Sequence, residues 1–184
     1  KSMRGKMYKV ITEELITSVI GTSEEQIIEI NKKIESAFAN MATDSDLMEA
    51  ASMPGTQYGL QRGGGQHSLS DTYEQYIRMR ERQQIETNAY VRALTEKQET
   101  INRIISCYNV LTTDEHQALE YLYEKYDFQT GMMKLKKEKE VSKSTIIRWR
   151  KNALIHIKEL YDSSLSNIDI YQYFGDKNTK TKYR

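Results

Sequence analysis

Hydrophobic residues recur every three or four positions along most of the chain, and this spacing predicts α-helices. The first is expected from Thr12 to a stop at Gly21, with Leu15, Ile16, Val19 and Ile20 on one side. Ser23, with a glutamine three residues later, has the pattern of a capping box and predicts a second helix to about Asn40. Its apolar stripe consists of Ile27, Ile30, Ile34, Phe38 and Met41. Residues 1–50 are therefore expected to form an N-terminal helical segment.

The periodicity stops in residues 51–71, which contain the only proline, Pro54, and five of the nine glycines. Such a composition predicts a flexible linker. Ser70 or Asp71 is expected to cap a long central helix over residues 72–109. Its second half carries Leu94, Ile101, Ile105 and Tyr108 in a seven-residue register. That stripe predicts a helix–helix contact, either within the chain or between two chains.

Three further helical segments are expected in residues 110–162. Thr113 or Asp114 would cap the first, whose apolar residues are Ala118, Leu119, Leu122 and Tyr126. A turn is expected over residues 127–131, and Met132 then opens a second helix that is rich in lysine. The polar residues 163–184 are expected to form a partly disordered tail.

The third of these segments carries the clearest pattern. A turn at Glu140 and Val141 precedes Ser142, which is expected to cap a helix to about Asp162. By helical geometry, its buried face consists of Ile146, Trp149, Ala153, Ile157 and Leu160. The opposite face remains free to bind a partner.

Composition agrees with an all-α fold. The 184 residues are 38% hydrophobic and 29% charged, which favours one or two small, well-solvated helical domains over a large enzyme. Cys107 is the only cysteine, so no intrachain disulfide or thiolate zinc cluster is expected, in agreement with a reducing cytoplasm. No apolar run approaches the roughly 20 residues that a membrane span needs.

No motif predicts catalysis, a cofactor or a metal ion. The glycines at 63–65 follow no strand and precede no Gly-Lys-Ser, unlike a phosphate-binding loop. His67, His116 and His156 lack ligand spacing, and no Ser/His/Asp set or carboxylate pair is found. The chain is therefore expected to be neither an enzyme nor a binder of small molecules.

Charge is distributed unevenly although the net charge is only +1. Residues 132–158 contain nine Lys or Arg and two Glu, a net charge of +7. Residues 21–50 contain seven Asp or Glu and two Lys, a net charge of −5. This asymmetry predicts that the C-terminal element alone meets the phosphates of nucleic acid.

The free face of the last helix has the chemistry of a major-groove reader. An α-helix fits the major groove, where Arg and Lys donate to guanine and Ser and Asn serve other base edges. The candidate DNA-binding residues on this helix are Lys143, Ser144, Thr145, Ile147, Arg148, Lys151 and Asn152. Lys134 and Lys137, on the preceding helix, are expected to lie over the phosphate backbone. Double-stranded DNA is thus the expected partner.

These residues also resemble a known family. Val141-Ser142, Ile146, Ala153-Leu154 and Ile157 are spaced as in region 4 of the sigma-70 transcription factors. Leu111-Thr112, Glu115, Leu119, Met132 and Leu135 match the positions of that family's two preceding helices. The resemblance implies a helix-turn-helix domain in residues 110–162 whose promoter-reading positions are Lys143, Ser144, Ile147 and Arg148.

Four positions depart from the family pattern. Lys136, Lys139 and Glu140 stand where the family has a small residue, a large apolar residue and a glycine-like turn. Ile147 replaces a polar or basic residue, and its apolar side chain suits a thymine methyl group.

The layout of the whole chain resembles the RinA and ArpU group of phage late transcriptional regulators. The shared features are a Gly-Gly-Gly segment followed by Ser68-Leu69-Ser70-Asp71, a long charged helix and a final sigma-like module. The resemblance implies a phage-encoded activator of late genes that acts with the host RNA polymerase. Whether the chain forms a homodimer is left open.

Two alternative functions remain open on the sequence. A phage small terminase subunit also joins a helix-turn-helix to oligomerising helices, and a ring-shaped oligomer would favour it. A divergent alternative sigma factor is the other alternative, although no module for the upstream promoter element or for DNA melting is found.

Overall fold

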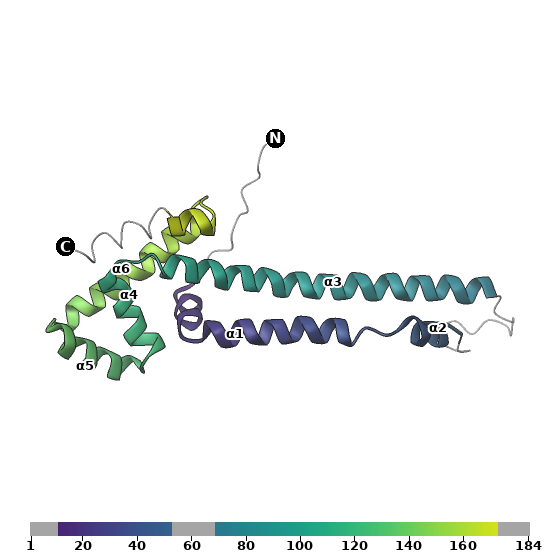
Figure 1. The fold of residues 1–184 in the computed structure, drawn as a ribbon, viewed down its shortest axis with the longest axis horizontal. Coiled ribbons are helices and arrows are strands. Elements are labelled where there is room, and N and C mark those ends of the chain that lie inside the picture. The colour runs from purple at the N-terminus through teal and green to yellow at the C-terminus, as the bar shows by residue number, and fades with distance from the viewer. Residues whose placement is uncertain (1–10, 53–68, 173–184) are drawn as a thin grey trace. The chain divides into compact units, whose positions relative to one another are not determined.

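The structure is a computed structural model that describes residues 11–52 and 69–172, and all regular elements in these ranges are helical (Figure 1). The prediction of an all-α fold is thus confirmed. In chain order the helices are α1 (Glu13–Ala39), α2 (Asp44–Ser52), α3 (Leu69–Tyr108), α4 (Thr113–Leu119), the π-helix η1 (Glu120–Glu124), α5 (Phe128–Lys139) and α6 (Lys143–Asp162). Residues 167–172 are also helical. None of the described helices has the length and hydropathy of a membrane span.

The chain forms two compact units. One, called here the terminal unit, groups Lys1–Ile28 with Lys97–Arg184; the other, the middle unit, comprises Glu29–Glu96. Helices α1 and α3 each contribute residues to both units.

Helix α1 contains the break that the sequence predicts, displaced by one residue. Thr22 has non-helical dihedral angles (φ −141°, ψ 26°) and separates the two expected helices. The side-chain amide of Gln26 donates a hydrogen bond of 2.8 Å to the hydroxyl of Thr22. The prediction that Ser23 caps the second helix was wrong, because Ser23 lies inside the helix that follows the break at Thr22. The apolar stripe that follows is only partly covered, since Ile30 is buried whereas Phe38 is 52% exposed.

In the middle unit, α2 packs on α3. The periodicity did not predict α2, but its start carries a reciprocal cap: the amide of Asp46 donates to the hydroxyl of Thr43, and the amide of Thr43 donates to the carboxylate of Asp46. Leu47 and Ala51 of α2 form a small core with Tyr76 of α3.

The predicted linker is shorter at both ends than expected. Helix α2 includes Ala51 and Ser52, and α3 begins at Leu69. Ser70 and Asp71 therefore lie inside α3 and do not cap it. The remaining linker residues, 53–68, including the three consecutive glycines, lie outside the described residues.

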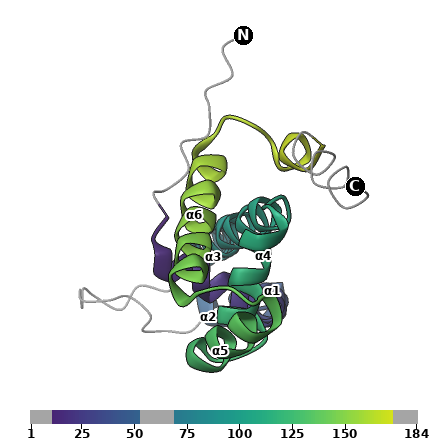
Figure 2. The same ribbon diagram turned by 90° about the vertical axis from the view of Figure 1, so that its left-hand side faces the viewer.

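In the terminal unit, α4 packs on α6, and α5 packs on both η1 and α6 (Figure 2). The cap of α4 is Thr112, whose hydroxyl donates a hydrogen bond of 2.8 Å to the carboxylate of Glu115. The prediction of Thr113 or Asp114 as the cap was wrong, because both residues already belong to the helix. Helix α4 continues directly into η1, whose i to i+5 bond joins the amide of Lys125 to the carbonyl of Glu120 at 2.8 Å.

The turn expected over residues 127–131 is also wrong, since α5 begins at Phe128. The carboxylate of Asp127 caps α5 by accepting bonds of 3.0 Å from the amides of Gln129 and Thr130. Gly131 lies within α5, where an added Cβ would stand 2.0 Å from the carbonyl oxygen of Tyr121. This glycine therefore permits close packing of α5 on η1 and forms no turn.

The start of the expected disordered tail is ordered. Arg103 of α3 is 1% exposed, and its guanidinium group contacts the end of α6 and the segment that follows. It donates to the carbonyl oxygens of Tyr161 (2.8 Å), Leu165 (2.9 Å), Leu160 (3.1 Å) and Ser163 (2.8 Å) and to the side chain of Asn167 (3.1 Å). Residues 163–172 are thus fixed to α3, and residues 173–184 lie outside the described residues.

Candidate functional site

The candidate site begins at the connection between α5 and α6. Three residues, 140–142, join the two helices. Glu140 adopts the left-handed conformation (φ 52°, ψ 34°), which costs a non-glycine residue roughly 1–2 kcal/mol. Glu140 thus takes the conformation that a glycine would favour. Ser142 then caps α6 as predicted, accepting a 3.2 Å bond from the amide of Thr145.

One face of α6 is held by the other helices of the terminal unit. Ile146, Ala153 and Ile157 are 0% exposed, as the periodicity predicts, and Trp149 and Leu160 are half-buried. Ile146 joins the core formed by Ala118, Leu122, Met132 and Leu135. Leu154 and Tyr161 extend the buried face beyond the predicted set.

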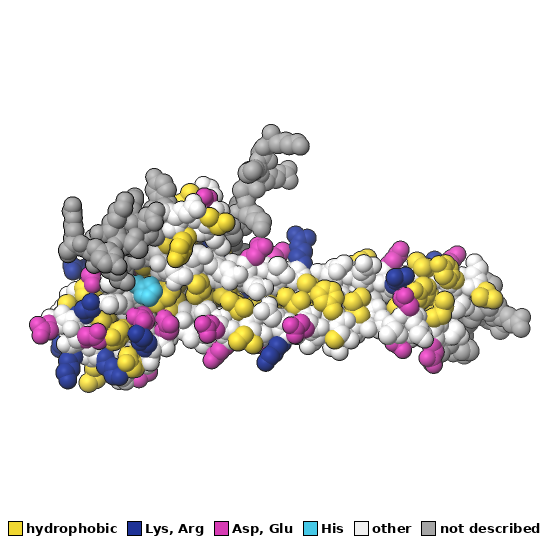
Figure 3. Space-filling view, viewed as in Figure 1, with side chains coloured by type: hydrophobic (Ala, Val, Ile, Leu, Met, Phe, Trp, Pro, Cys, Tyr) yellow, Lys and Arg dark blue, Asp and Glu magenta, His cyan; other side chains and the backbone are white. Residues whose placement is uncertain are grey.

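The opposite face of α6 is open to solvent. The exposed candidates are Lys143, Ser144, Ile147, Arg148, Lys151 and Asn152 of α6 and Lys134 and Lys137 of α5, whereas Thr145 is half-buried. Four of these side chains form no ion pair or hydrogen bond with the described residues: those of Lys137, Lys143, Arg148 and Lys151. Lysine and arginine side chains project from the α5 end of the terminal unit (Figure 3). The cations that the sequence predicted to bind DNA are thus all exposed, on α5 and on the side of α6 that faces away from the core.

Three of the candidate residues have contacts within the protein. The ammonium group of Lys134 lies 3.7 Å from the centre of the Tyr126 ring. The hydroxyl of Ser142 lies 2.7 Å from that of Ser144 and 2.9 Å from that of Thr145. Ser144 and Thr145 therefore contribute to the start of α6 itself.

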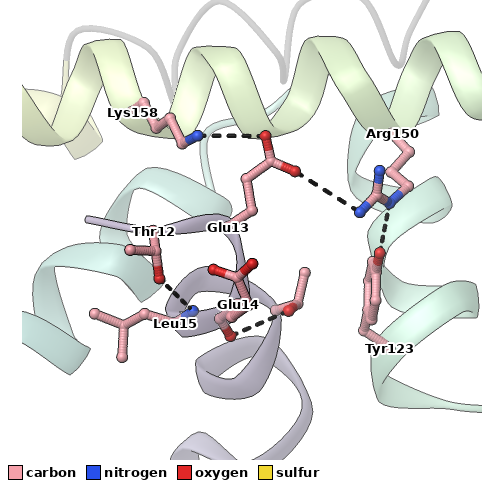
Figure 4. A network of polar contacts seen from close by, with 8 residues as sticks. Thr12, Glu13, Glu14, Leu15, Tyr123, Arg150 and Lys158 are labelled. Atoms are coloured by element: carbon pink, nitrogen blue, oxygen red, sulfur yellow. Dashed lines mark hydrogen bonds and ion pairs between the residues drawn. The ribbon is translucent and has the colours of Figure 1, made fainter. Parts of the chain in front are cut away.

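Two further cations of α6 are paired with an N-terminal residue. Glu13 of α1 lies 3.9 Å from the guanidinium group of Arg150 and 3.4 Å from the ammonium group of Lys158 (Figure 4). Arg150 also donates to the hydroxyl of Tyr123. The charge of +7 in residues 132–158 thus overstates the positive charge available to a partner, because Glu13 lies outside that range.

A second glycine allows α1 to approach η1. A Cβ on Gly21 would stand 2.8 Å from the carbonyl oxygen of Tyr123. Ile16, Val19 and Ile20 beside it are almost completely buried. The first turns of α1 therefore belong to the same packed unit as α6, which the sequence analysis did not anticipate.

Both histidines in the described part of the terminal unit have structural partners. His156 lies 2.9 Å from the carboxylate of Glu115, which also accepts a hydrogen bond from the capping residue Thr112. The ring of His116 stacks on that of Tyr108 at 4.2 Å. Cys107 is buried, and burial raises the pKa of its thiol to about 11 although the charge of Arg103 acts in the opposite direction. In the described ranges, no cluster of three or more His, Cys, Asp or Glu side chains could hold a metal ion.

Comparison of the chain with models of protein families, with curated proteins and with solved structures found no match.

Proposed function

We propose that the chain is a sequence-specific DNA-binding protein in which α5 and α6 form a helix-turn-helix and α6 is the reading helix. The observation that carries this proposal is the division of α6 into two faces. One face is buried against α4 and α5, and the other presents Lys143, Arg148 and Lys151 without protein partners among the described residues. Desolvating such cations is favourable only where anionic or acceptor groups replace water.

The exposed groups fit the two kinds of contact that duplex DNA offers. The first turns of a reading helix meet base edges, so Lys143 and Arg148 would donate to guanine O6 and N7. Lys151 extends the cationic surface along the same helix, and Asn152 supplies an amide for other base edges. Lys134 and Lys137 of α5 would contact phosphates, which sets affinity and salt dependence and not sequence preference.

The biological setting of the proposal rests on resemblance. The spacing of α6 is similar to sigma-70 region 4, and the chain layout is similar to phage late regulators. We therefore propose that the protein is phage-encoded, activates late genes and acts with the host RNA polymerase. The N-terminal helices, with the acidic residues of 21–50, would supply the surface for polymerase or for a second copy.

A binding experiment with a charge-matched control tests the proposal. Duplexes are selected from a random-sequence library with the full chain, and affinities are measured by fluorescence anisotropy. Lys143→Ala/Arg148→Ala is expected to weaken binding to the selected duplex at least about tenfold, because each lost base contact costs about 1–3 kcal/mol. Lys32→Ala/Lys97→Ala removes the same charge from exposed positions elsewhere and is expected to change affinity less than about twofold.

Two results would contradict the proposal. If no duplex is bound above background, the chain does not recognise DNA in this way. If both double variants lose affinity equally, the attraction depends on overall charge and α6 does not read the groove.

A further inference from the structure

The exposed face of α6 contains a large apolar side chain, Ile147, between two lysines. Ile147 is 44% exposed and lies four residues after Lys143 and four residues before Lys151. Residues four apart are neighbours on one face of a helix, so a lysine stands on each side of this isoleucine. Single exposed apolar residues are common on proteins. Here the two lysines would bring any bound polyanion directly onto the isoleucine.

This inference rests on the proposed function, in which α6 enters the major groove. An isoleucine side chain has neither a donor nor an acceptor, so it cannot replace the hydrogen bonds that base edges lose on leaving water. Thymine is the base whose major-groove edge carries a methyl group, and that group can pack against an aliphatic side chain. We propose that Ile147 determines specificity by contacting the C5-methyl group of a thymine in the target duplex.

Ile155 provides an internal comparison because it is almost equally exposed, at 42%, on the same helix. It lies about 12 Å farther along the axis, at a rise of about 1.5 Å per residue. Its neighbours four residues away are Lys151 on one side and Glu159 on the other. A carboxylate beside Ile155 would be repelled by phosphates, and base contacts come from the first turns of a reading helix. Ile147 is therefore the isoleucine placed to meet a base.

The experiment uses the duplex selected with the full chain and a set of copies in which each thymine in turn is replaced by deoxyuridine. Deoxyuridine pairs like thymine and lacks only the C5-methyl group. Replacement at one position is expected to weaken binding by the full chain about fourfold, the value of about one buried methyl group. Replacement at the other thymines is expected to have smaller effects.

Two protein variants then assign the methyl contact to a residue. Ile147→Ala is expected to bind the thymine duplex about fourfold or more weakly and to show no further loss on deoxyuridine replacement at that position. Ile155→Ala, the matched control, is expected to keep the wild-type response to deoxyuridine. Because both side chains are exposed on α6, neither variant should lose the fold.

The outcomes separate this inference from the proposed function. If the duplex is bound but no deoxyuridine replacement weakens binding, the thymine contact is refuted and DNA recognition stands. If Ile147→Ala retains the full response to deoxyuridine, another residue contacts the methyl group. Absence of any duplex binding would overturn the proposed function and this inference together.

Discussion

The terminal and middle units differ in how completely they bury their apolar side chains. In the terminal unit, Ile16, Ile104, Leu119, Leu135, Ile146 and Ile157 are 0% exposed. In the described part of the middle unit, the buried residues are Ile30, Leu47, Ala51 and Tyr76, whereas Ile85 is 68% exposed. Since burial of apolar area is the main favourable term in folding, the terminal unit should be the more stable of the two.

The two units also differ in their polar contacts, and this difference again favours the stability of the terminal unit. In the middle unit, four ion pairs each join two residues that lie four positions apart in the same helix. One is on α1, Lys33–Glu29, and three are on α3: Arg78–Glu74, Arg82–Glu86 and Arg92–Glu96. Such exposed pairs add little to stability. In the terminal unit, Arg103 and Glu115 join segments far apart in sequence. The middle unit has a long-range ion pair as well, Arg80–Asp44, but both of its side chains are exposed. Burial of the long-range polar contacts at Arg103 and Glu115 therefore distinguishes the unit that carries α6.

The largest expected effects come from truncating one leucine in each core. Leu122→Ala should lower the free energy of unfolding by about 4 kcal/mol, because Leu122 is 1% exposed and its neighbours are packed on all sides. Leu47→Ala should cost about 2 kcal/mol, since its cluster is small and can relax. Urea denaturation followed by circular dichroism measures both. Equal losses would remove the energetic distinction between the units.

Replacing the buried arginine should have the next largest effect. Arg103→Met leaves the carbonyl groups at the end of α6 without their donor, and a loss of about 3 kcal/mol is expected. Arg92→Met is the control on the same helix, because Arg92 is exposed and pairs only with Glu96 among the described residues. The control should unfold at nearly the wild-type urea concentration. A similar shift in both variants would show that Arg103 acts only through helix propensity.

The two glycines that contact η1 should give a graded response. Gly131→Ala places a Cβ at 2.0 Å from the carbonyl oxygen of Tyr121, so the backbone must move at an expected cost of about 2–3 kcal/mol. Gly21→Ala, at 2.8 Å from the carbonyl oxygen of Tyr123, should cost about 1 kcal/mol. Thermal unfolding of both variants tests the order. In an open helix the same change stabilises, so a gain in either variant would refute the close approach.

The smallest effect at neutral pH concerns Cys107. Burial raises the pKa of its thiol from 9.0 to about 11, so the folded protein keeps the proton at pH values where the unfolded chain loses it. Its contribution to stability is therefore complete below pH 9 and is lost as the pH rises to about 11. A thiol reagent at pH 8 should label native protein far more slowly than urea-unfolded protein. Cys107→Ala should show a weaker loss of stability between pH 9 and 11 than the wild type.

Local sequence patterns were sufficient to predict most of the extent of helices α3 and α6. The serine cap at Ser142, the end at Asp162 and the buried positions Ile146, Ala153 and Ile157 were predicted from spacing and capping chemistry. Both signals act within a few residues of one another, so a single sequence contains them in full. The capping pair of Thr43 and Asp46 carried the same kind of signal for α2, which hydrophobic periodicity alone missed.

Features that depend on distant neighbours were predicted wrongly or missed. Gly131 was assigned to a turn because glycine usually breaks helices, whereas its function is to let α5 approach the backbone of Tyr121. Residues 163–184 were expected to be partly disordered because their composition is polar, yet Arg103 of α3 binds the carbonyl groups of Ser163 and Leu165 in this segment. Neither partner can be identified from the local sequence.

The sequence by itself therefore determined that the chain is helical, where α6 begins and which of its faces is apolar, because these properties arise from neighbours along the chain. Tertiary structure decided which cations on α6 face solvent and which are paired with Glu13, since Coulomb attraction depends on distance in space. It also decided that Glu140 adopts a left-handed conformation, because packing of α5 and α6 on α4 and η1 must outweigh the local backbone cost.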